Sequence, residues 1–254
     1  MIYAIAIIAV QVITLIHIVR SGRTMPWLYV VIFLPLVGSI AYLVAEVLPE
    51  ALGGQQAQHL GETLKDRADP ERHLRALQDA AQQNDTPQAR IKVAQELARL
   101  GRSADAAEAY RAAMTGLFAD DEDLQFSLTT ALFDAAEQGQ GSWAAARAAL
   151  TRLQEINPEF HRKEQILFQA RLAEADGDVA LAGRLYQELM VGFSSLEVRV
   201  RYAHFLFQNG RRDDARAMLL GVLDEAKRAA PHVRQMQAHW FQQAEAALAI
   251  VNRA

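Results

Sequence analysis

A pattern of glycine, alanine and a bulky residue recurs four times between residues 101 and 219. In each copy an alanine follows the glycine by five residues, and a tyrosine or leucine follows the alanine by four. The copies are Gly101–Ala106–Tyr110, Gly141–Ala146–Leu150, Gly177–Ala182–Tyr186 and Gly210–Ala215–Leu219. The alanines lie 40, 36 and 33 residues apart, a period typical of two-helix repeats. Such units bury their apolar faces by stacking on one another.

Each residue type in this pattern suits a place in a pair of packed helices. The glycine ends the first helix in a left-handed cap. The small alanine lets the second helix approach the first closely, and the bulky residue one turn later fills the space between them. Further alanines at 94, 170 and 203 occupy the small position of the first helix in units one, three and four. We therefore predict an all-α fold in which residues 70–254 form an α-α solenoid of about four units.

The pattern resembles the tetratricopeptide repeat, a helix–turn–helix unit of about 34 residues. The resemblance covers residues 87–226, and unit two carries extra residues at EQGQGSW before its second helix. Solenoids need covered ends. A helical stripe over residues 232–251 predicts a capping helix; it consists of Met236, Trp240, Ala244, Leu248 and Val251. A helix over residues 70–83 is expected to cover the other end.

Two long apolar runs precede the repeats. Residues 2–19 contain no charged residue except His17, and residues 27–48 contain one acid, Glu46. As helices they would be about 27 and 33 Å long, close to the thickness of a bilayer core. The seven residues between them include Gly22 and Pro26, which suit a tight reversal. We predict a transmembrane hairpin (2–19 and 27–48), followed by a linker over 49–69.

A cleaved signal peptide is the competing interpretation of the first run. It requires a basic start, and no Lys or Arg precedes this run. The short loop carries Arg20 and Arg23, so the positive-inside rule places it in the cytoplasm. The repeats would then lie on the periplasmic side of a bacterial inner (plasma) membrane.

The hairpin resembles the N-terminal membrane segment of bacterial cardiolipin synthases of the phospholipase D superfamily. The shared blocks are LPLVG at 34–38 and IAYL at 40–43. The resemblance implies a membrane anchor. The catalytic H-x-K-x4-D signature of that superfamily is not carried over, because His161 and Lys163 are followed by Phe168 where aspartate is required. The chain as a whole resembles bacterial membrane-anchored tetratricopeptide-repeat proteins of unassigned function.

Composition and spacing argue against several other functions. The chain has no Cys, and none of its seven His form a zinc-binding i, i+4 pair. A net charge of −4 offers no basic excess for nucleic acid. The acidic run 120–123 lacks the ligand spacing of a calcium loop and suits the first turn of a helix instead. We expect no enzyme activity, no cofactor and no metal.

The remaining candidate surface is the groove formed by the first helices of the units. The repeat register puts nine side chains on it: Gln95, Arg99, Phe133, Glu137, Arg171, Glu174, His204, Phe207 and Gln208. Phe133 and Glu137 belong to the groove only if the extra residues of unit two lie in its turn. An aromatic with mixed charges suits an extended peptide or a helix. An ordinary solvated face is the alternative interpretation.

Three functions follow as hypotheses. The first is a membrane-anchored scaffold that recruits a protein or peptide partner through the groove. The second is an assembly factor comparable to cytochrome c maturation proteins, although those have a long loop where residues 20–26 are short. The third is a lipid-associated accessory protein related to cardiolipin synthesis through its hairpin, which would contact membrane lipid.

Overall fold

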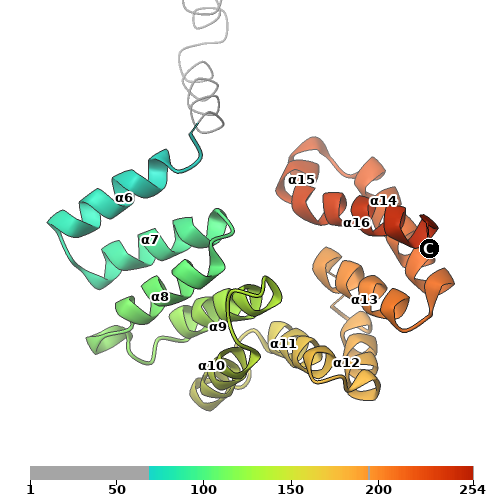
Figure 1. Cartoon of the computed structure of the whole chain (residues 1–254), viewed down its shortest axis with the longest axis horizontal. Coiled ribbons are helices and arrows are strands. Elements are labelled where there is room, and N and C mark those ends of the chain that lie inside the picture. The colour runs from blue at the N-terminus through green and yellow to red at the C-terminus, as the bar shows by residue number, and fades with distance from the viewer. Residues whose placement is uncertain (1–68, 194, 254) are drawn as a thin grey trace, which may run out of the picture. The chain divides into compact units, whose positions relative to one another are not determined.

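The computed structural model describes residues 69–193 and 195–253 (Figure 1). Within those ranges the chain is helical and contains no strand. The chain divides into two compact units, residues 1–76 and 77–254. The predicted hairpin (2–19 and 27–48) and nearly all of the linker lie outside the described residues. Among the helices that are described, none is both long and apolar enough to cross a bilayer.

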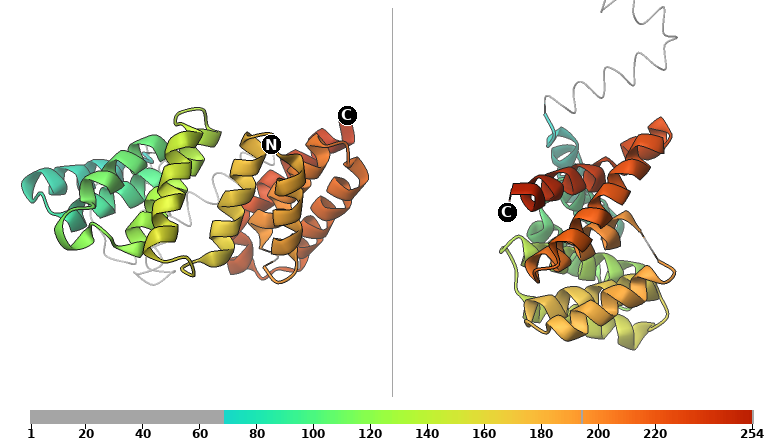
Figure 2. Two further views of the ribbon diagram at one scale, coloured as in Figure 1. Left: turned by 90° about the horizontal axis from the view of Figure 1, so that it is seen from below. Right: turned by 90° about the vertical axis from the view of Figure 1, so that its right-hand side faces the viewer.

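Helix α6 (Arg72–Gln83) crosses the boundary between the two units. Four antiparallel pairs follow in unit 77–254 (Figure 2): α7 (Pro87–Arg99) with α8 (Ser103–Ala113), α9 (Glu122–Glu137) with α10 (Trp143–Ile156), α11 (Arg162–Ala175) with α12 (Val179–Met190), and α13 (Leu196–Gln208) with α14 (Arg212–Arg228). A 3-10 turn, η2 (Gly116–Phe118), lies between α8 and α9. The short α15 (Pro231–Met236) and the long α16 (Ala238–Arg253) close the chain.

Five of the eight helices in these pairs begin at a capping side chain. The caps accept a hydrogen bond from the backbone N–H three residues further on, and they are Thr86, Asp121, Ser142, Asp178 and Ser195. Each such cap stabilises a helix by about 1 kcal/mol. Asp121 is the N-cap of α9, and Glu122 and Asp123 lie in its first turn. The acidic run therefore forms the start of a helix, as the sequence predicts.

The turns that join the two helices of each pair show where the extra residues of unit two lie. Gly101, Gly177 and Gly210 end the first helices with φ between 74° and 78°, as predicted. In unit two the left-handed glycine is Gly139 (φ 70°), so the prediction for Gly141 is wrong. This turn holds five residues, 138–142, whereas the turns of the other pairs hold three. The first helix of unit two therefore ends next to Gly139, two residues before Gly141. A Cβ at Gly141 would lie 3.1 Å from the Cβ of Ala135. Gly141 therefore lets the turn pass close to α9 and does not cap the helix.

The small and bulky positions pack as predicted. The alanines of the second helices, Ala106, Ala146, Ala182 and Ala215, are fully buried. Their bulky partners one turn later, Tyr110, Leu150, Tyr186 and Leu219, are buried as well. The first-helix alanines Ala94, Ala170 and Ala203 are also fully buried. Small residues from both helices therefore meet along the middle of three of the four pairs.

The predicted capping helix is two helices. Gln237 separates α15 from α16, and α16 packs on both helices of the last pair. Phe241, Ala244 and Val251 are its buried residues. Met236 is 77% exposed, so it does not belong to the packed stripe. Met236 is the last residue of α15, before the break at Gln237, so it does not continue the face of α16 that packs on α13 and α14.

We expect Ala182→Leu to lower the free energy of unfolding of the chain by about 1–3 kcal/mol, because a fully packed contact between α11 and α12 has no room for extra carbons. Denaturant unfolding followed by circular dichroism would measure the change. Ala180→Leu, at an exposed position on the same helix, is the matched control and should change it by less than about 0.5 kcal/mol. Equal effects of the two variants would contradict this account of the packing.

Candidate functional site

Three connected hollows lie along the first helices of the repeats. The first, of about 710 Å³, is lined by residues of α7, α9, α11, α13 and α16. The second, of about 580 Å³, shares Glu137, Arg171, Arg201 and Gln243 with it. The third, of about 450 Å³, shares Glu164, Leu167, Glu197 and Trp240 with the first. The four repeats and the capping helix thus contribute to one continuous surface.

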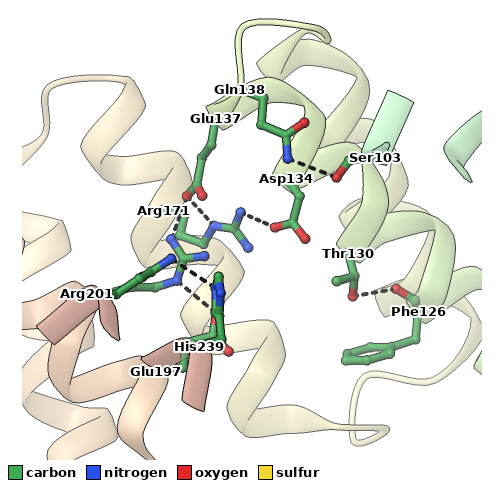
Figure 3. Close-up of polar contacts among 11 residues, drawn as sticks. Ser103, Phe126, Thr130, Asp134, Glu137, Gln138, Arg171, Glu197, Arg201 and His239 are labelled. Atoms are coloured by element: carbon green, nitrogen blue, oxygen red, sulfur yellow. Dashed lines mark hydrogen bonds and ion pairs between the residues drawn. The ribbon is translucent and has the colours of Figure 1, made fainter. Parts of the chain in front are cut away.

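A buried arginine lies at the middle of this surface (Figure 3). Arg171 of α11 is only 3% exposed. Its Nε donates to Oε1 of Glu137 at 2.7 Å, and its Nη2 donates to Oδ1 of Asp134 at 2.8 Å. Both carboxylates belong to α9, so the guanidinium joins the first helices of units two and three. Charge-assisted hydrogen bonds of this length are among the stronger polar interactions in proteins.

A second arginine extends the network to unit four. Nη1 of Arg201, on α13, donates to the same Glu137 oxygen at 2.8 Å. Its Nε donates to Oε1 of Glu197 on its own helix, also at 2.8 Å. Glu137 therefore joins α9 directly to α13, although the pair α11 and α12 lies between them in the chain. We call these five residues, Asp134, Glu137, Arg171, Glu197 and Arg201, the ion-pair network.

Aromatic rings lie against both guanidinium groups of the ion-pair network. The Cζ atom of Arg171 is 5.0 Å from the ring centroid of Phe133 and 5.7 Å from that of Phe168. The two phenylalanine rings stack at 4.5 Å. The Cζ atom of Arg201 is 5.6 Å from the ring of Trp240, on α16. These are cation–π distances, so each arginine contacts both a carboxylate and an aromatic ring.

The network shifts the pKa values of two of its members, Glu137 and Arg201. Burial by itself would raise the pKa of Glu137, but the guanidinium groups of Arg171 and Arg201 lower it below its ordinary value. Burial opposes the charge of Arg201, yet Glu137 and Glu197 raise the pKa of its guanidinium. Arg171 and Arg201 therefore stabilise the charged form of Glu137, and Glu137 and Glu197 stabilise the charged form of Arg201.

Glu174 behaves differently from Glu137. Burial raises the pKa of Glu174 above its ordinary value, although the Tyr186 hydroxyl that donates to its Oε1 opposes the shift. Burial also raises the pKa of Tyr186 itself. Tyr186 is fully buried and is the bulky residue of the third repeat copy, so a residue of the repeat pattern also anchors a carboxylate of the groove.

The structure brings most of the predicted groove residues together. Six of the nine line the first two hollows: Arg99, Glu137, Arg171, Glu174, His204 and Gln208. Phe133 occupies the expected register position, but its side chain is fully buried beneath Arg171. Gln95 is exposed and lines none of the three hollows. Phe207 packs against the apolar core instead.

Several residues of the site are not predicted from the sequence. Thr130, Phe168 and Arg201 all line the first hollow. They lie three residues before Phe133, Arg171 and His204, which is one helical turn earlier on the same face. Extending the repeat register by one turn would have found them. The stripe over 232–251 assigns Trp240 to the packed side of the cap, and no sequence signal indicates that it also faces the groove.

Comparison with known proteins shows similarity at the level of structure. No protein-family model matches the chain, and no curated protein matches it either. The crystal structure of a thermophilic tetratricopeptide-repeat protein from Thermus thermophilus is similar, with a TM-score of 0.49 and 18% sequence identity. The match covers 73% of this chain and 95% of that one.

We expect Arg171→Met to lower the free energy of unfolding by about 1.5–3 kcal/mol, because Asp134 and Glu137 lose the hydrogen bonds that Arg171 donates to them and Glu137 keeps only the one from Arg201. Denaturant unfolding would measure the loss. Arg147→Met is the matched control: Arg147 forms a bidentate pair with Asp176, but both side chains are 51% exposed. That variant should lose no more than about 1 kcal/mol. An Arg171→Met variant as stable as this control would contradict a structural role of the network.

Proposed function

We propose that the chain is a scaffold that recruits a protein or peptide partner through the surface formed by its first helices. The observation that carries this proposal is the continuity of the hollows, which draw side chains from every repeat and from α16. A surface spread over several units suits an extended segment or a helix of a partner. Among the described residues, no group of three or more His, Cys, Asp or Glu side chains is arranged to hold a metal ion.

The character of the surface supports a polypeptide partner. Aromatic side chains, paired charges and amides alternate along it, and the groups of the ion-pair network are already held in place by one another. Such a preorganised surface loses little side-chain entropy when a partner binds. The exposed His204 and Gln208 offer polar contacts at the far end of α13, beside the exposed Ile250 of α16.

We further propose that residues 2–19 and 27–48 anchor the chain in a bacterial inner membrane, with the repeats in the periplasm. The support is the sequence: two long apolar runs joined by a short loop with Arg20 and Arg23. An anchored scaffold concentrates its partner at the membrane, because the tether raises the effective concentration of a second contact there.

A photo-crosslinking amino acid in the groove tests the proposed partner. We expect the chain carrying p-benzoylphenylalanine in place of His204 to form a discrete adduct with a partner polypeptide on irradiation of cells. The same residue in place of Arg184, exposed on the second helix α12, is the control. Adducts that form equally at both positions, or at neither, would count against recruitment through the groove.

The side of the membrane can be tested with a single cysteine, since the native chain has none. Val191 is 86% exposed, so Val191→Cys provides an accessible thiol. We expect a membrane-impermeant maleimide to label this variant in cells whose outer membrane has been permeabilised and whose inner membrane is intact. Labelling only after the inner membrane is broken would place the repeats in the cytoplasm and overturn the proposed orientation.

A further inference from the structure

The three hollows carry more carboxylates than cations. Six carboxylates line them: Asp134, Glu137, Glu164, Glu174, Glu197 and Glu225. Four guanidinium groups line them, and no lysine does: Arg99, Arg171, Arg199 and Arg201. Every one of these arginines already has a carboxylate partner. The surface therefore holds spare negative charge and, among the residues that the structure describes, no arginine or lysine without a carboxylate partner.

The chain itself shows how this surface binds a cation. Arg171 lies between two carboxylates of α9 and the rings of Phe133 and Phe168. Arg201 lies between Glu197 and the ring of Trp240. In both places a guanidinium contacts a carboxylate and an aromatic ring at once. Planar guanidinium groups are suited to both kinds of contact at once.

Glu164 lines hollows that two of these aromatic rings also line and, among the described residues, has no arginine or lysine partner. Its carboxylate lines the first and the third hollows, at the point where they meet, together with Trp240. The rings of Phe126 and Phe168 line the first hollow as well. The Glu164 side chain is 33% exposed, and within the described ranges its only ion-pair partner is Nδ1 of His161 at 3.7 Å. His161 stacks on Phe126 at 4.4 Å and is a cation only when protonated.

We propose that the hollow at Glu164 binds an arginine or lysine side chain of the partner polypeptide, with the Glu164 carboxylate as its anchor and the aromatic rings as its walls. This inference rests on the proposed function and deepens it by naming the chemical class of the partner: a basic segment. An acidic segment would meet six carboxylates and only arginines that are already paired. An arginine fits better than a lysine, because its planar group can stack on a ring while it pairs with a carboxylate.

A peptide library displayed on phage tests this inference with the full chain in lipid nanodiscs. Random heptapeptides are selected on the native chain, on Glu164→Gln and on Glu159→Gln. Glu159 lies five residues earlier, is 70% exposed and lines none of the three hollows, so it is the matched control. We expect several-fold enrichment of arginine and lysine on the native chain and on the control, and loss of that enrichment on Glu164→Gln.

A selected peptide then gives a direct measurement of the contact. We expect its dissociation constant to rise about tenfold or more on Glu164→Gln, and by a similar factor when its arginine is replaced by the uncharged citrulline. The two changes together should cost little more than either one alone, since both remove the same interaction. The unfolding temperature of Glu164→Gln, measured beside the native chain, separates a lost contact from a lost fold.

The outcomes separate this inference from the function on which it rests. Enrichment of acidic or apolar peptides, or basic enrichment that persists on Glu164→Gln, would overturn the cation site while leaving a peptide-binding groove. Additive effects of Glu164→Gln and the citrulline peptide would also overturn it, because the two groups would then act independently. A native chain that retains no peptide above empty nanodiscs would count against the groove as a binding surface, and the cation site would fall with it.

Discussion

Close contact between two helices at small residues is the constraint on which the repeat unit depends. In units one, three and four an alanine of the first helix and an alanine of the second, such as Ala170 and Ala182, are both fully buried. Because neither side chain separates the backbones, the bulky Tyr186 one turn later can fill the space beside them. With three of the four pairs held this way, the first helices stand next to one another and present one shared surface. The groove therefore results from the close packing of the two helices within a unit.

The ion-pair network then determines how that surface is arranged. A guanidinium as buried as that of Arg171 must be paired, since the cost of removing a charge from water is otherwise large. Asp134 and Glu137 supply the pairing from the neighbouring unit, and Glu137 also reaches Arg201 of the unit beyond. These charges hold repeats together, and three of them, Glu137, Arg171 and Arg201, also line both of the first two hollows. Because these charges are paired with one another, Glu164 is the charged side chain best placed to bind a partner.

The repeat pattern predicted the fold well because it depends on local rules. Glycine caps, small contact positions and helix starts such as Asp121 act within about one helix and its turn, so their spacing alone locates the helices. The register also placed Arg171, His204 and Gln208 on the groove, since side chains four residues apart share a helix face. It assigned Gly141 wrongly because a five-residue turn offers two glycines, and only the packing of the helix end selects between them.

What the sequence determined by itself is the architecture: paired helices, their order and the face that each first helix presents. The apolar runs before residue 49 predict an anchor from composition and length, and this stays a prediction because they lie outside the described residues. Only the tertiary structure decided which charges meet. Glu137 and Arg201 are separated by 64 residues, and no periodicity relates them. Phe133 shares its register position with exposed residues of other units, yet Arg171 covers it, because contacts between units depend on the side chains that neighbouring helices bring to the same place.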